Sequence, residues 1–237
     1  MAIAPSSSLA AADCLSMRPV RLSDEILLAV DTCFGACSAA VLAGSKVLAS
    51  RRVVMERGHA EALAPMVEEV MAAAALSFSQ LEKLAVTTGP GSFTGQRVGL
   101  AFMRGLRLAL AKPLIGITSL AAMAAQARSE TGRAMAAAVH DAKRDEVYLE
   151  IPGHTEMPRL LSINDAAHTL AAFDGIALAG TAAQRMAEHC HDAIITAITA
   201  PDAVWVGRLA VDAKEHGTPR PLYLRPPDAK LPAAAKP

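Results

Sequence analysis

The stretch ILLAVDTCFGACSAAVLAGSKVLASRRVV, residues 26–54, decides the fold. It opens with a continuous apolar run over residues 26–30, which is typical of a strand covered on both faces. Turn residues around Gly35 and Gly44 separate this run from two further apolar segments, so we expect three strands joined by tight turns. Three consecutive strands argue against the Rossmann and P-loop plans, which alternate strand and helix from the start.

Helices and strands alternate after this opening. Apolar residues at three- and four-residue steps predict a helix over residues 59–75. Then follow a strand over 84–88, a helix over 94–111, a strand over 113–119 and a helix over 120–128. The second half repeats the order β-β-β-α-β-α-β-α loosely, so we expect two related lobes, each a mixed sheet with flanking helices.

The two lobes are expected at residues 25–130 and 131–237, the second with an extended, proline-rich tail. Residues 1–24 are rich in small residues, which indicates a disordered extension. They lack the features of a signal peptide, and no apolar run approaches the ~20 residues of a membrane helix. We therefore expect a cytoplasmic protein with no membrane contact.

The charge balance argues against a strongly basic nucleic-acid binder, and the cysteine and histidine spacing argues against a metal site. Lys plus Arg and Asp plus Glu both number 23, which disfavours a strongly basic nucleic-acid binder but leaves room for a local basic patch. Cys33 and Cys37 are too far apart for a CxxC motif, and the HCH run at residues 189–191 has no second ligand pair. We expect no metal site.

The loop TTGPGSFTG, residues 87–95, lies between a predicted strand and a predicted helix. Its glycines fall one residue off the dinucleotide fingerprint, and no lysine completes a Walker A motif. Ser92 or Thr94 can cap the helix, whose free N–H groups attract anions. The alternative is a structural turn in which Gly95 and Gly99 permit close packing, and the spacing does not decide between the two.

Asp31 and Thr32 at the end of the first strand are a second candidate site. The carboxylate can face a magnesium-phosphate group or cap its own turn. The residues that we expect near any phosphate or nucleotide are Asp31, Thr32, Gly89, Gly91, Ser92 and Thr94. Arg97 and Arg104 are seven apart and share a helix face, where they can contact RNA or a partner, or remain solvated.

Six segments together resemble the bacterial TsaB (YeaZ) family. They are ILLAVDTCFGACSAAVL, RGHAEALAPMVEEVM, TTGPGSFTGQRVGLAFMRGLRLAL, PLIGITSL, DAKRDEVY and PLYLRPPDAK, in order over residues 26–230. The resemblance implies an α/β protein with the actin-like ATPase fold of the Hsp70 and sugar-kinase type. It also implies a non-catalytic scaffold and activating subunit. Its complex would carry out threonylcarbamoylation of N6 of the adenosine beside the anticodon, in tRNAs that read codons starting with A.

The resemblance also implies partners. They are TsaD, a catalytic paralogue, and the ATPase TsaE, with tRNA reached through the complex and a homodimer when the chain is alone. No cofactor belongs to this chain, and ATP or ADP is expected only at the interface of the assembled complex. TsaD carries a metal-binding H-x-x-x-H motif. In this chain His59 is in the first position and Leu63 replaces the second histidine, so no catalytic residue is expected. A free-standing nucleotide-dependent enzyme of the same fold, using Asp31 and the glycine loop, is the alternative.

In this family the helices corresponding to residues 59–75 and 94–111 pack against TsaD. Both helices carry apolar residues on more than one face, and a second apolar face needs a second partner. The expected interface residues are His59, Leu63, Met66, Val67, Val70, Met71, Gly95, Gly99, Phe102, Met103 and Leu106. One departure is Lys143, where many relatives have arginine, because lysine lacks the planar fork that binds anions through two bonds.

Overall fold

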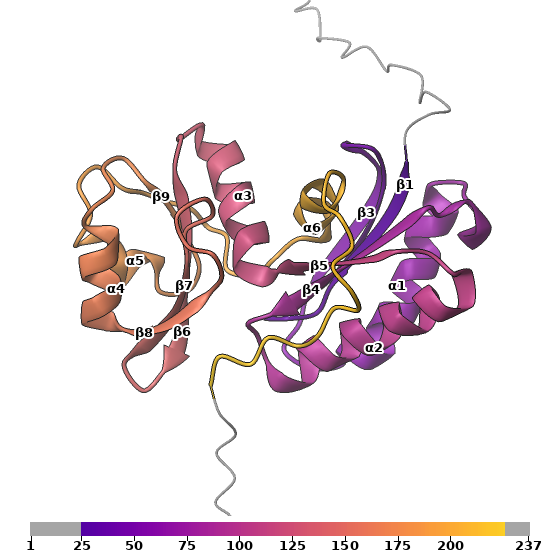
Figure 1. The fold of residues 1–237 in the computed structure, drawn as a ribbon, viewed down its shortest axis with the longest axis horizontal. Helices are drawn as coiled ribbons and strands as arrows, with labels where there is room; N and C mark the ends of the chain where they lie inside the picture. Colours follow the sequence, from indigo (N-terminus) through magenta and orange to yellow (C-terminus); the bar gives the residue numbers. More distant parts are fainter. Residues whose placement is uncertain (1–24, 226–237) are drawn as a thin grey trace, which may run out of the picture.

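The computed structural model describes residues 25–225, which form two lobes (Figure 1). The first contains β1 (Ile26–Asp31), β2 (Ala36–Ala43), β3 (Lys46–Val54), α1 (His59–Ala73), η1 (Phe78–Gln80), β4 (Lys83–Gly89), α2 (Phe93–Leu110), β5 (Leu114–Thr118) and α3 (Ser119–Thr131). The second contains β6 (Ala136–Lys143), β7 (Glu146–Glu150), β8 (Arg159–Ser162), α4 (Ile163–Leu170), β9 (Ala177–Ala179), α5 (Ala183–Ala187), β10 (Ile194–Ile195) and α6 (Ala203–Ala210). The three opening strands and the alternation after them are confirmed.

The two sheets have the same topology. Strand order is β3-β2-β1-β4-β5 in one sheet and, read from its other edge, β8-β7-β6-β9-β10 in the second. In both, the first strand pairs antiparallel with the second and parallel with the fourth. This doubled β-β-β-α-β-α-β-α arrangement is the actin-like fold that the resemblance implies.

Alternating side chains of the strands build a separate core on each face of the first sheet. Leu28 and Val30 of β1 point into a core with α1 and α2, whereas Leu27 and Ala29 point into a core with α6. This alternation follows from the two-residue period of a strand, and it explains why β1 reads as a continuous apolar run. The second sheet is likewise covered by α4 and α5 on one face and by α3 on the other.

The third helix of each half packs against the sheet of the other half. α3 lies on β6 and β9, and α6 lies on β1 and β2, so both helices stand between the two sheets (Figure 1). The expected boundary between residues 130 and 131 stays a prediction, and α6, which follows it in the chain, packs on the first sheet. The reason is physical: Leu27 and Leu42 belong to an apolar face on which α6 packs, together with Ala122 of α3. The expected extension, residues 1–24, and residues 226–237 of the expected tail lie outside the described residues.

Candidate functional site

The glycine loop rests on the turn that follows β1. Ser92 is the N-cap of α2, and its Oγ accepts a hydrogen bond of 3.1 Å from Gly95 N, as one of the two expected caps predicts. Ser92 N in turn donates to Cys33 O at 2.6 Å. The loop is thus fixed between the start of α2 and the end of β1.

Three glycines allow this contact. A Cβ on Gly91 would lie 2.4 Å from Cys33 O, one on Gly95 would lie 2.0 Å from Thr32 O, and one on Gly99 would lie 2.6 Å from Thr32 Oγ1. Thr32 Oγ1 donates to Gly95 O at 2.7 Å and accepts from Gly99 N at 3.1 Å. The glycines therefore serve close packing, and the geometry favours the structural turn over the phosphate cradle.

Asp31 is fully buried beneath the same turn. Its Oδ1 accepts hydrogen bonds from Thr87 Oγ1 at 2.6 Å and from Cys33 N at 3.1 Å, while its Oδ2 is buried and has no partner within residues 25–225. Burial raises the pKa of this carboxyl to about 7. Two roles are expected for Asp31 from the sequence, a contact with a magnesium-phosphate group and a cap of its own turn. The hydrogen bond from Cys33 N is the second of these, the turn cap.

The two lobes touch directly at this turn. The Phe34 ring stacks on His140 of β6 with 3.8 Å between the ring centres. Burial lowers the pKa of His140 to about 4, so the imidazole is neutral at pH 7. Glu150 of β7 makes a second contact between the lobes because it accepts a 2.6 Å hydrogen bond from Thr118 Oγ1, and burial raises its pKa to about 7.

Most of the expected partner-interface residues lie in the core. These buried residues are Leu63, Met66, Val67, Val70, Met71 and Met103, which pack with the sheet under α1 and α2. His59 is also buried, and Phe102 and Leu106 are partly buried against the same core. A partner cannot reach the buried set while the protein is folded. The outer face of the two helices instead exposes Ala64, Ala101, Gly105 and Leu108.

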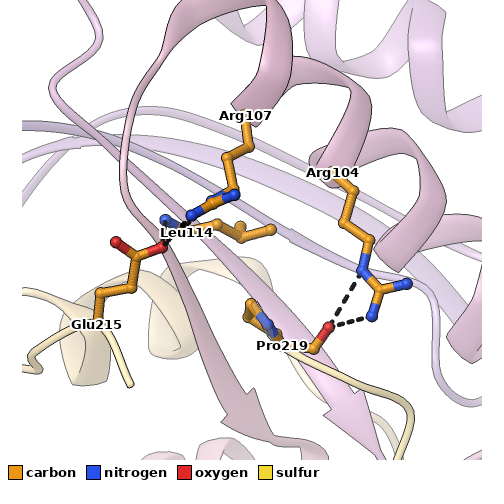
Figure 2. Close-up of polar contacts among 5 residues, drawn as sticks. All are labelled: Arg104, Arg107, Leu114, Glu215 and Pro219. Atoms are coloured by element: carbon orange, nitrogen blue, oxygen red, sulfur yellow. Dashed lines mark hydrogen bonds and ion pairs between the residues drawn. The ribbon is translucent and has the colours of Figure 1, made fainter. Parts of the chain in front are cut away.

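The arginine row of α2 holds a distant segment of the chain, residues 213–225, which we call the C-terminal strap. Arg97 Nε donates to Tyr223 Oη at 2.8 Å, and Arg104 donates to Pro219 O from both Nε and Nη2. Arg107 forms an ion pair of 3.0 Å with Glu215, whose Oε1 also lies near Leu114 N (Figure 2). The row is therefore neither a bare solvated face nor wholly free for RNA.

The aromatic partners of Arg97 were not predictable from any motif in the sequence. Its guanidinium carbon lies 3.6 Å from the centre of the Phe93 ring, and Phe93 stacks on Tyr223 with 5.7 Å between ring centres. Aromatic residues make up only 3% of the chain, and this scarcity is the one sequence signal that singles such residues out.

A pocket of about 350 Å³ lies between the N-termini of α1 and α2. Arg57, His59, Ser92 and Thr94 line it, which brings Ser92 and Thr94 to one open surface. Glu56 and Glu61 line it as well, and their carboxylates oppose an anion there. The pocket therefore has mixed charge.

Within residues 25–225, no three His, Cys, Asp or Glu side chains are grouped as a metal ion would require. Across the same described part of the chain, every helix is too short or too polar to cross a bilayer.

Comparison with known proteins identifies relatives in sequence and structure. A family model described as TsaD, tRNA N6-adenosine threonylcarbamoyltransferase, matches residues 52–150. The TsaB protein of Escherichia coli (strain K12) is 36% identical over 122 residues, covering 52% of each chain. The TsaB protein of Haemophilus influenzae is 42% identical over 125 residues, covering 52% of this chain and 51% of the relative. The chain thus spans about half the length of the curated relatives that it matches.

A solved structure matches over a longer range. YeaZ from Pseudomonas aeruginosa is 31% identical, superposes with a TM-score of 0.72, and is covered over 100% of its length by 84% of this chain. A second structure from the same organism, described as similar to the peptidase YeaZ, gives 30% identity, the same TM-score and the same full coverage.

Proposed function

Because the chain belongs to the TsaB (YeaZ) family, we propose that it takes part in the biosynthesis of tRNA threonylcarbamoyladenosine in the cytoplasm. Its role is that of a non-catalytic scaffold and activating subunit that binds TsaD, the catalytic paralogue. TsaE and tRNA join through that complex. ATP or ADP binds at the interface of the assembly, and this chain supplies no cofactor of its own.

One observation carries the non-catalytic role. The H-x-x-x-H motif of TsaD places two histidines one helical turn apart, and in this chain the second position is Leu63. Leu63 is 1% exposed and packs in the core of the first lobe. His59 Nε2 lies 3.2 Å from Phe34 O, so this ring contacts the turn after β1. With one buried histidine and no second histidine at position 63, this chain lacks the metal-binding pair of TsaD. This supports a role in which the partner is the catalytic subunit.

The outer face of α1 and α2 is the surface that we assign to TsaD. Ala64, Ala101 and Gly105 are small exposed residues, which allow the close approach of a facing helix. Leu108 is 79% exposed, and a large apolar side chain in that position is suited to a central contact. The same surface pairs two copies of the chain when TsaD is absent.

Co-elution with TsaD tests this surface. Leu108→Glu places a charge in the centre of the contact, so the variant is expected to remain folded by circular dichroism and to lose co-elution. Met157→Glu is the matched control because Met157 is also exposed, at 54%, in the loop between β7 and β8. Retained co-elution of the Leu108→Glu variant would refute the assigned surface.

The non-catalytic role has its own assay. The chain alone and the chain with TsaD are supplied with tRNA and preformed threonylcarbamoyl-adenylate, and transfer is measured. We expect transfer only in the presence of TsaD. Transfer by the chain alone would overturn the scaffold role, and nucleotide hydrolysis by the chain alone would support the free-standing enzyme instead.

A further inference from the structure

Positive charge is concentrated on one strip of a chain that has no net charge. Residues 93–112, which include α2, and the C-terminal strap together contain seven basic residues and one acidic residue. In the folded protein they are neighbours, because three arginines of α2 contact the strap. Figure 2 shows two of these contacts, those of Arg104 and Arg107. We call these two segments the basic strip. Such a local excess of positive charge attracts a polyanion.

Most of this charge is not neutralised within the strip. Arg97 donates to a tyrosine hydroxyl and Arg104 to a backbone carbonyl, and neither acceptor carries a charge. Arg107 pairs with Glu215, which is the only acid of the strip. At the far end of the strap, Arg225 pairs with Glu146 of β7. The positive charges of Arg97 and Arg104 therefore lie beside uncharged acceptors and are not neutralised by them.

One end of the strip has exposed aromatic rings. Phe93 is 58% exposed and Tyr223 is 47% exposed, and their planes are inclined by 30° with Arg97 against the Phe93 ring. Aromatic rings next to a guanidinium group provide the surface on which unpaired bases stack. The long arginine side chain is held in place by Tyr223 Oη, which lowers the entropy lost when a ligand binds.

We propose that the basic strip binds single-stranded RNA. Its phosphates contact Arg97 and Arg104, and an unpaired base stacks on the Phe93 and Tyr223 rings at the start of α2. The two arginines share a face of α2 with Ala101 and Leu108, so RNA and TsaD compete for this face. An acidic protein surface would neutralise the same arginines but would leave the two rings without a stacking partner, so RNA fits better. The identity of the RNA as tRNA rests on the proposed function, whereas the binding of single-stranded RNA does not.

Fluorescence anisotropy with a labelled oligouridylate RNA tests this proposal on the full chain alone. We expect the affinity to fall as salt rises, and Arg97→Gln to reduce the slope of log affinity against log salt by about 0.7. Phe93→Ala and Tyr223→Ala are each expected to weaken binding about tenfold. Tyr223→Phe keeps the ring and is expected to retain most of the affinity. The matched control is Arg159→Gln, which removes an exposed arginine from β8 of the other lobe and is expected to leave the affinity unchanged.

Two results would overturn the proposal. The first is that wild type, Phe93→Ala and Tyr223→Ala bind oligouridylate with the same affinity. The other is a poly-glutamate peptide that competes more strongly than unlabelled tRNA, which would assign the strip to an acidic protein. The RNA assay uses no TsaD and the co-elution assay uses no RNA, so failure of this inference and failure of the proposed function are distinguishable.

Discussion

Asp31, at the end of β1, is a single side chain whose protonation makes the stability of the fold depend on pH. Both its oxygens are buried, one accepts two hydrogen bonds, and the other has no partner among the described residues. The usual pKa of an aspartate is 3.8, and burial raises that of Asp31 to about 7. The folded state therefore holds a proton on this carboxyl over a pH range in which the unfolded chain has released it.

The sign of the resulting pH dependence follows from linkage. The stability that Asp31 contributes is fully present below about pH 4 and is lost as pH rises towards about 7, because the unfolded state then binds fewer protons. Asp31→Asn cannot ionise, and its Oδ1 can still accept from Thr87 and Cys33. We therefore expect the free energy of unfolding of the variant to increase relative to that of wild type as pH rises. The increase is about 1.4 kcal/mol for each unit by which the pKa of Asp31 differs between the folded and unfolded states.

Urea unfolding of both proteins at several pH values between 4 and 8 measures this difference. Using the difference cancels the titration of groups that the two proteins share, including Glu150, whose pKa is raised in the same direction. A difference that stays constant across the range would show that Asp31 does not hold a proton in the folded state.

At the scale of the element, α2 places its glycines in two contrasting environments. Gly95 lies against Thr32, and a Cβ there would approach a backbone oxygen, whereas a Cβ on Gly105 would meet nothing within 4 Å. Both lie in the same helix, so helix propensity and packing can be compared in one background.

Alanine at these two positions is expected to have opposite effects. Gly95→Ala should destabilise the protein by about 1–3 kcal/mol or more, because the backbone of the turn must shift. Gly105→Ala should stabilise it by about 0.5–1 kcal/mol, because alanine loses less entropy in a helix interior. Thermal midpoints that move in the same direction for both variants would contradict this account of the helix.

Helix α2 also shows the limit of sequence-based prediction. Its position was predictable from periodicity, and the Ser92 cap from residue type. Periodicity shows that a helix has two apolar faces but not which one the sheet covers. Met103 is therefore expected at a partner interface, whereas in the structure it lies in the core with Leu63 and Val67 of α1. Arg97 contacts a residue 126 positions away, and no local pattern reveals such a contact.

For the whole molecule, the exchange of α3 and α6 between the lobes couples their stability. Each sheet loses the cover of one face when the other half unfolds, because α6 lies on the first sheet and α3 on the second. The stacking of Phe34 on His140 adds a direct contact. In each lobe, one face of the sheet is therefore covered by a helix from the other half of the chain.

Unfolding of the two lobes is therefore expected to occur in one transition. Trp205 is the only tryptophan and lies in α6 against the first sheet, so its fluorescence reports on that lobe. Far-ultraviolet circular dichroism reports on both lobes. The two signals should give the same midpoint in urea, as two-state unfolding requires. A circular dichroism transition that continues after the tryptophan signal is complete would show that the second lobe unfolds independently.

The position of α6 also has a consequence for the nascent chain on the ribosome. The strands of the first sheet are made early, but the helix that covers Leu27, Ala29 and Leu42 is made only after the whole second sheet. At a rate of roughly 5–20 residues per second, this apolar face waits several seconds for its cover. The apolar face of the first lobe is therefore open to contacts with other chains during synthesis until α6 has been made and covers it.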